Sequence, residues 1–314
     1  MPIVGKIQHP DHERKRRGPL HSLAMLPAIM SMGNLLCGFT AIFFAMRAVV
    51  VAWEQSHVEY ELPGTLLELM LPSFLSLGAG LVMLAIVFDG LDLLLTRVTR
   101  PATDFAGQLD SLADVVSFGI APATLMIAFM TLQLQEIEIL PSPVSAHVLG
   151  RFAWISTAVY VVATAIRLAK HHAEYAPSVK GKREFRGLPT SAAAAFLASL
   201  LIFQDQGTGL AFRPYLVYIM PGLAIVTGFL MISRVPYVRF HRTYLLGHQP
   251  FRQFIIVMAI LAVFWLYKAP TLVLLVFWYL ASGPVAWMVR RIQGHDRDDE
   301  GIFTLPFDQS RASG

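Results

Sequence analysis

Cysteine and charged residues are both scarce in this chain. Of 314 residues, one is cysteine and 15% are charged, whereas 55% are hydrophobic. A single cysteine excludes an internal disulfide and any metal site built from several thiolates. So few charges cannot cover the surface of a soluble chain of this size, and the mean hydropathy of +0.56 agrees. We therefore expect an integral membrane protein.

The chain also lacks the motifs of several enzyme classes. It has no glycine-rich phosphate loop, no serine–histidine–aspartate pattern and no visible internal repeat. Its ten histidines are scattered, and the one adjacent pair, His171 and His172, would point about 100° apart on a helix. Cys37 lies within an apolar run, where we expect it to be a packing residue. A metal shared by the two histidines is therefore not expected.

Long apolar runs recur at lengths that fit membrane crossing. They predict an all-α integral membrane protein, a polytopic helical bundle with about eight transmembrane helices. A six-plus-two arrangement also fits, because one of the runs is short. Only residues 267–270 separate the last two runs, and this short connection predicts a helical hairpin. The runs lie near residues 24–46, 71–95, 112–132, 148–168, 191–204, 214–233, 253–267 and 270–289.

Basic residues predict the orientation of these helices. With the N-terminus inside, 21 of the 25 lysine and arginine residues fall in inner segments. The basic run at 14–17 precedes an apolar segment longer than the core of a cleavable signal, so we expect it to face anionic headgroups rather than nucleic acid. Both ends are therefore predicted to be cytoplasmic. As a separate expectation, the membrane is the cytoplasmic membrane of a bacterium or an archaeon. The four exceptions are Arg47, Arg151, Arg213 and Lys268.

Four aspartates form the pattern with the clearest chemistry. Asp89 and Asp92 are three residues apart, and Asp110 and Asp114 are four apart. On a helix each pair projects from one face, and two such faces that meet could hold divalent cations. Carboxylates are costly at membrane depth, so we expect these four to be functional residues.

Three basic residues are predicted to lie at the same membrane level as the four aspartates. Arg97 follows Asp92 by five residues, and its guanidinium could bind a pyrophosphate through two hydrogen bonds. Arg167 and Lys170 end another apolar run. They either extend to lipid phosphates or line an anionic or acceptor pocket beside the aspartates, and both interpretations stay open.

The stretch from Asp89 to Arg97, followed by Gly107, Asp110 and Asp114, resembles the signature of the CDP-alcohol phosphatidyltransferase family. That signature reads D-x-x-D-G-x-x-A-R, eight residues, then G-x-x-x-D-x-x-x-D. The spacing of all four acids and of the arginine matches. The resemblance covers about residues 20 to 245, and further segments resemble the phosphatidylserine synthase branch, namely 26–38, 109–119, 167–169, 187–189 and 233–234.

This resemblance implies a membrane enzyme that transfers the phosphatidyl group of CDP-diacylglycerol to L-serine and releases CMP. It implies that Asp89, Asp92 and Asp110 bind Mg²⁺ or Mn²⁺. It further implies that Asp114 completes the metal site and acts as the general base. The residue chemistry agrees, because an alcohol needs a base close by and a metal ion would stabilise charge on the leaving CMP.

Other expectations from the resemblance concern lipid binding and organisation. We expect membrane lipids and a second copy of the chain as partners, and no nucleic acid. The expected divisions are a basic segment (1–19), the phosphatidyltransferase-like six-helix domain (20–245), an added transmembrane hairpin (246–290) and a polar tail (291–314). The residues expected to bind CDP-diacylglycerol are Asn34, Thr96, Arg97 and Gly107.

Three positions depart from the family signature. Leu93 and Thr96 stand where the family has glycine and alanine, and the second glycine falls on Ala106, with Gly107 one place late. Glycine lets a ligand approach the backbone, whereas Leu93 adds a side chain at i+4 from Asp89. Three hypotheses stay open: an active phosphatidyltransferase for serine or another alcohol, an altered or inactive homologue, and a cation transporter that uses the carboxylates.

Overall fold

The computed structural model describes residues 26–53, 73–99, 104–136, 143–174, 187–206, 208–233, 235 and 269–292. Within these ranges every regular element is a helix. Lipid offers the backbone no hydrogen-bond partners, so an apolar chain in a membrane pairs its N–H and C=O groups within helices. The elements are α1 (Leu26–Trp53), α3 (Phe74–Thr99), α4 (Asp104–Asp114), η3 (Val115–Ile120), α5 (Ala121–Glu136), α6 (Pro143–Glu174), α7 (Thr190–Phe203), α8 (Thr208–Ile232) and α11 (Ala269–Ile292).

Six helical spans in the described part of the chain are long and apolar enough to cross a membrane. The prediction of an all-helical membrane protein is confirmed, but the number of about eight is not. The run at 191–204 forms α7, whose 14 residues extend about 21 Å and fall short of a hydrocarbon core of about 30 Å. The run at 270–289 forms α11, whereas the run at 253–267, its expected partner in the predicted hairpin, lies outside the described residues.

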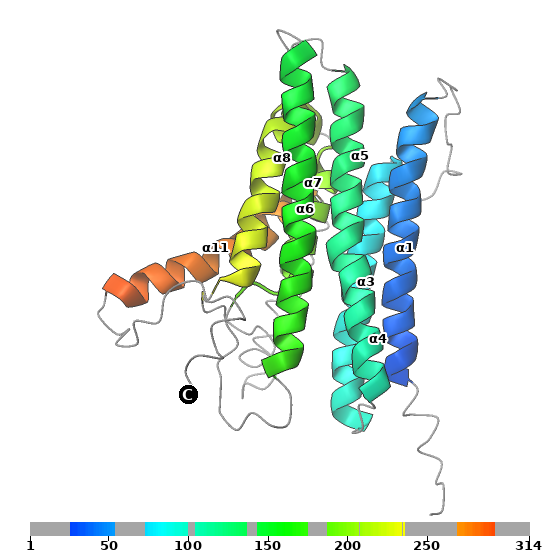
Figure 1. Ribbon diagram of the computed structural model, residues 1–314, viewed down its shortest axis with the longest axis vertical. Coiled ribbons are helices and arrows are strands. Elements are labelled where there is room, and N and C mark those ends of the chain that lie inside the picture. The colour runs from blue at the N-terminus through cyan, green and yellow to red at the C-terminus, as the bar shows by residue number, and fades with distance from the viewer. Residues whose placement is uncertain are drawn as a thin grey trace, which may run out of the picture.

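The helices form one elongated bundle. Figure 1 shows α1 and α3 side by side, and α4, η3 and α5 as one continuous rod that rises from the lower end of α3. The short helix α7 is apolar on all faces and packs against α3, α8 and α11, as expected of a helix buried in the protein. Helix α11 lies at a steep angle to the others (Figure 1).

The rod passes α1 at very close range. A Cβ added to Gly38 would lie 2.7 Å from the Cα of Ser117, so only glycine fits against this turn. Ser117 belongs to η3, a π-helical turn that starts directly after Asp114. Its hydroxyl donates to the Asn34 carbonyl at 2.8 Å, and the Tyr160 hydroxyl of α6 donates to the Phe118 carbonyl at 2.7 Å. Hydrogen bonds to α1 and α6 thus pair polar groups of this π-helical turn.

A polar junction joins three helices at the opposite end of the bundle from α4. Asp205, just after α7, accepts hydrogen bonds from the hydroxyl of Ser73, at the start of α3, and from the side chain of Gln204. Arg213 of α8 forms an ion pair with Asp205 at 3.0 Å. Burial raises the Asp205 pKa above its ordinary value, and the Ser73 and Arg213 contacts oppose that shift. Arg213 is one of the four basic residues that fall outside the predicted inner segments, and it thus has a specific partner in Asp205.

Candidate functional site

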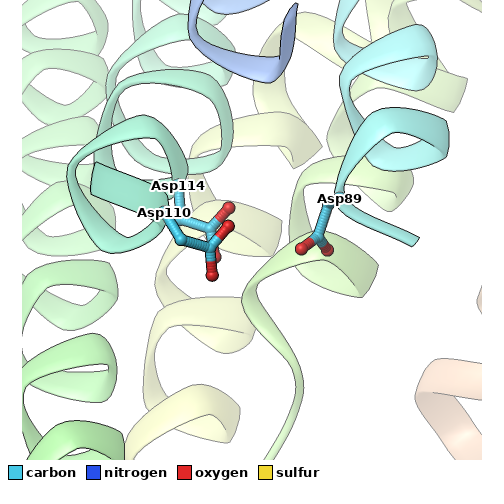
Figure 2. A group of neighbouring side chains, drawn as sticks. All are labelled: Asp89, Asp110 and Asp114. Atoms are coloured by element: carbon cyan, nitrogen blue, oxygen red, sulfur yellow. The ribbon is translucent and has the colours of Figure 1, made fainter. Parts of the chain in front are cut away.

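Three of the four predicted aspartates come together. One carboxylate oxygen each of Asp89, Asp110 and Asp114 lies within 4.8 Å of the other two. Figure 2 shows Asp110 and Asp114 extending from one helix toward the space beside Asp89. The i, i+4 spacing puts Asp110 and Asp114 on one face of α4. Both α3 and α4 pack against α1, which brings that face beside the end of α3. The site lies at one end of the bundle.

This arrangement is electrostatically unfavourable without a cation. Two carboxylate charges at this separation repel by about 3 kcal/mol or more at an effective dielectric constant of about 20. Asp114 is 9% exposed, and the Asp110 Oδ1 atom is buried with no hydrogen-bond partner among the described residues. Three carboxylates form an all-oxygen ligand set, which suits hard divalent cations such as Mg²⁺ and Mn²⁺. The residues therefore fit the predicted metal ion.

Helix α1 supplies polar groups to the same site. The Asn34 amide, 0% exposed, donates from Nδ2 to Asp114 Oδ1 at 3.0 Å. Ser31, one turn earlier and equally buried, lies beside Asp110. We predicted Asn34 as a lipid-binding residue and did not single out Ser31. Two polar residues three positions apart in an otherwise apolar run are the signal that could have found both.

The structure also locates the remaining residues of the motif. Asp92 is buried on α3 but is not one of the three clustered carboxylates. Gly107 lies on α4, and a Cβ there would meet nothing within 4 Å. Leu93 is 49% exposed, so its side chain is not packed in the protein interior. Thr96 and Arg97 lie on the last turns of α3, where the side chains are outside the described part of the structure.

Arg167 and Lys170 lie on α6 near the same end of the bundle. Arg167 is 4% exposed and donates from Nε to the Leu188 carbonyl at 3.4 Å, whereas Lys170 is half-buried. Leu188 lies in the short segment before α7. This segment packs against the end of α8 at Gly187. The Gly187 φ of 101° and a 2.6 Å approach of any Cβ to the Met231 carbonyl oxygen require glycine. Arg167 thus contacts this segment, while an acceptor pocket there stays a proposal.

Helical spans with an oxygen-ligand site at one end of the bundle define a polytopic membrane protein with a candidate metal centre. The family model for CDP-alcohol phosphatidyltransferase matches residues 24–230, about two thirds of the sequence. The chain belongs to this family, and the resemblance inferred from its motifs is confirmed.

Individual relatives agree with this family. The CDP-diacylglycerol–serine O-phosphatidyltransferase of Helicobacter pylori strain J99 is 22% identical over 272 residues, which cover 86% of this chain and 94% of the relative. The protein of the same name from Methanocaldococcus jannaschii is 31% identical over 175 residues, covering 56% of this chain and 68% of the relative. Archaetidylserine synthase of Methanothermobacter thermautotrophicus is 29% identical over 161 residues, covering 51% and 57%.

Proposed function

We propose that this protein synthesises phosphatidylserine by transferring the phosphatidyl group of CDP-diacylglycerol to L-serine. The observation that carries the proposal is the convergence of Asp89, Asp110 and Asp114 in a chain of this family. The relatives support the acceptor in particular. Their names specify two kinds of lipid product, phosphatidyl and archaetidyl, but serine in both cases.

In the proposed reaction the serine hydroxyl oxygen forms a bond to the phosphorus that carries the diacylglycerol. The bond from that phosphorus to the bridging oxygen breaks, and the electron pair leaves with CMP. Asp114 accepts the proton of the hydroxyl. A carboxylate is a weak base, but Asp114 lies within the cluster where the phosphates would sit. Its closeness to the serine hydroxyl would compensate for its low basicity.

Asp89, Asp92 and Asp110 would hold the divalent cation, and Asp114 would complete its ligands. Bound there, Mg²⁺ or Mn²⁺ would offset the charge of the pyrophosphate and of the leaving CMP. Helices α3 and α4 do the positioning, because each carboxylate projects from a packed helix and not from a loop. Rigid placement of this kind keeps the charged groups close despite their mutual repulsion.

Residues around the carboxylates would bind the substrates. We assign Thr96, Arg97 and Gly107 to the nucleotide end of the CDP-lipid, with the Arg97 guanidinium on the pyrophosphate. Arg167 and Lys170 would form the acceptor pocket. The distribution of basic residues supports a cytoplasmic location for this end, and membership of the family supports a homodimer.

Two alternatives remain, and the geometry favours neither. A cation transporter would need its carboxylates near the middle of the membrane, but Asp89 lies near the end of its span and Asp110 near the start of its span. An inactive homologue would need Leu93 to block the site. Its side chain is 49% exposed, and the assay below separates this alternative from an active enzyme.

The test is CMP release by the purified protein in detergent, given CDP-diacylglycerol and Mn²⁺, with and without L-serine. Serine-dependent release with formation of phosphatidylserine is the expected result. Release that depends on glycerol 3-phosphate or inositol phosphate would change the acceptor but keep the reaction class. If folded protein releases no CMP with any of the three, the proposal is wrong.

A further inference from the structure

Asn34 occupies an unusual place in the first transmembrane helix. Its side chain is completely buried, yet it donates a hydrogen bond to Asp114, a residue 80 positions later in the chain. The other atom of the amide, Oδ1, is buried without a hydrogen-bond partner among the described residues. An amide with one unpaired atom lowers stability relative to an apolar residue of the same shape. Packing alone therefore does not account for asparagine here.

The backbone of Asn34 makes a second link to the same segment. Its carbonyl accepts the hydroxyl of Ser117 in the π-helical turn η3. The side chain of Asn34 thus holds Asp114 on one side of the junction, and its main chain holds the next turn on the other. Single π-helical turns occur often at functional sites, because they change the direction of neighbouring side chains.

We propose that Asn34 is a positioning residue for Asp114. The hydrogen bond from Nδ2 fixes the rotation of the carboxylate about its last bond and occupies Oδ1, so that Oδ2 is left for the reaction. A carboxylate oriented by a neighbouring group is more effective than one that rotates, as is known for the groups that hydrogen-bond to metal ligands and hold them in place. This inference rests on the proposed function for its catalytic meaning, and it replaces direct lipid binding as the main role of Asn34.

The test substitutes Asn34→Leu, which keeps the branched shape of the side chain and removes the donor. Steady-state kinetics should show kcat lowered by about 10–100-fold, the usual range for loss of such a partner, with KM for CDP-diacylglycerol within about twofold. If KM rises at least tenfold with kcat maintained, Asn34 binds the substrate directly and the proposal is wrong.

A second readout does not depend on turnover. Mn²⁺ affinity is measured by electron paramagnetic resonance in wild type, Asn34→Leu, Asp114→Asn and the double variant. If Asn34 acts through Asp114, the leucine weakens Mn²⁺ binding in wild type by about tenfold. It then has no further effect once Asp114 is replaced, because the two residues act as one unit. Additive losses, or no loss in the single variant, would overturn the assignment.

Ser199→Ala is the control. It removes a buried hydroxyl that bonds within α7, to the Phe196 carbonyl, and that takes no part in the junction of Asn34, Asp114 and η3, so kcat and Mn²⁺ affinity should stay close to wild type. If Asn34→Leu does not fold, as judged by gel filtration, Asn34→Ala replaces it in both measurements. A wild type without serine-dependent turnover but with coupled Mn²⁺ binding would refute the proposed function and keep the positioning role. An active wild type in which Asn34→Leu and Asp114→Asn weaken Mn²⁺ binding additively would keep the proposed function and refute the positioning role.

Discussion

Asp114 combines three properties that bear on the chemistry. It is buried, it belongs to a cluster of three carboxylates, and it accepts a hydrogen bond from a different helix. Asp89 and Asp110 share the cluster, but Asp114 is the most buried of the three. These features support its selection as the proton acceptor.

Replacing Asp114 by asparagine should therefore abolish transfer and leave much of the affinity for the CDP-lipid. General base catalysis contributes about 100- to 10,000-fold, so kcat should fall by at least about 100-fold. CMP release gives the rate, and the shift of Tm by CDP-diacylglycerol reports binding. Asp205→Asn, which replaces a buried carboxylate at the other end of the bundle, is the control. Wild-type turnover in Asp114→Asn would refute the role of base.

Leu93 tests the largest departure from the family signature. Replacing it by glycine restores the signature, and it opens no internal cavity because the side chain is half-exposed. We expect activity equal to or above that of wild type, with a helix cost of about 1 kcal/mol in stability. Leu91→Gly is the matched control, since Leu91 lies on the same helix at 42% exposure and outside the signature glycine position. A loss of turnover confined to Leu93→Gly would show that Leu93 supports the site.

At the scale of elements, the contact between α1 and η3 depends on Gly38. An added Cβ would lie 2.3 Å from the Ser117 hydroxyl and 2.7 Å from its Cα, and a backbone atom cannot move aside as a side chain can. Gly38→Ala should separate the two elements and lower stability by about 1–3 kcal/mol, the usual cost of overpacking. Gly222→Ala, which meets nothing within 4 Å, should keep or raise Tm. Equal Tm values for the two variants would show that α1 can move freely here.

The polar junction of α3, α7 and α8 predicts an asymmetric response. Arg213→Leu leaves the Asp205 carboxylate buried without its cation, which should cost about 2–4 kcal/mol. Asp205→Asn should cost less, because Arg213, with 29% of its side chain exposed, can reach water. If the arginine variant is the more stable of the two, the junction does not depend on charge pairing.

The junction also predicts a dependence on pH. The Asp205 pKa is raised above its ordinary value of 3.8, chiefly by burial. The folded state therefore binds the proton more tightly than the unfolded state, and the stability this adds is present at low pH and is lost as the pH rises through the raised pKa. Tm measured at pH 5 and pH 8 should show a larger deficit for Arg213→Leu at pH 8. In Asp205→Asn this contribution should vanish.

At the scale of the whole molecule, the bundle has two chemically different ends. The carboxylates lie where α3 ends and α4 begins, whereas α6 begins at the opposite end, after α5. Exposed positions exist near both ends, Gln108 on α4 and His147 on α6. The distribution of basic residues predicts that the carboxylate end faces the cytoplasm.

This orientation is tested with single cysteines in a Cys37→Ala background, since Cys37 is the one native cysteine. A membrane-impermeant maleimide applied to intact cells should label His147→Cys. It should label Gln108→Cys only after the membrane is opened. The reverse pattern would place the active end outside and contradict the cytoplasmic assignment.

The class of the molecule and the helices that carry the site follow from local sequence patterns. Long apolar runs require helices in lipid, whatever their neighbours are, so the all-helical membrane fold could be predicted. The 3.6-residue period places Asp110 and Asp114 on one face before any packing is known. The family also followed from local spacing, because its signature spans α3 and α4 alone. The predicted number of about eight spans is not confirmed: six are found in the described residues, where the run at 191–204 forms the short, buried helix α7.

Which residues meet depends on how the helices pack, and local patterns do not contain that information. Periodicity describes one helix at a time, whereas the contact of Asn34 with Asp114 and that of Ser73 with Asp205 join residues 80 and 132 positions apart. Such pairs depend on how helices cross and how closely they approach, which side chains on several helices set together. For the same reason, the clustering of Asp89 with Asp110 and Asp114, the π-helical turn beside them and the partner of Arg213 all required the packed molecule.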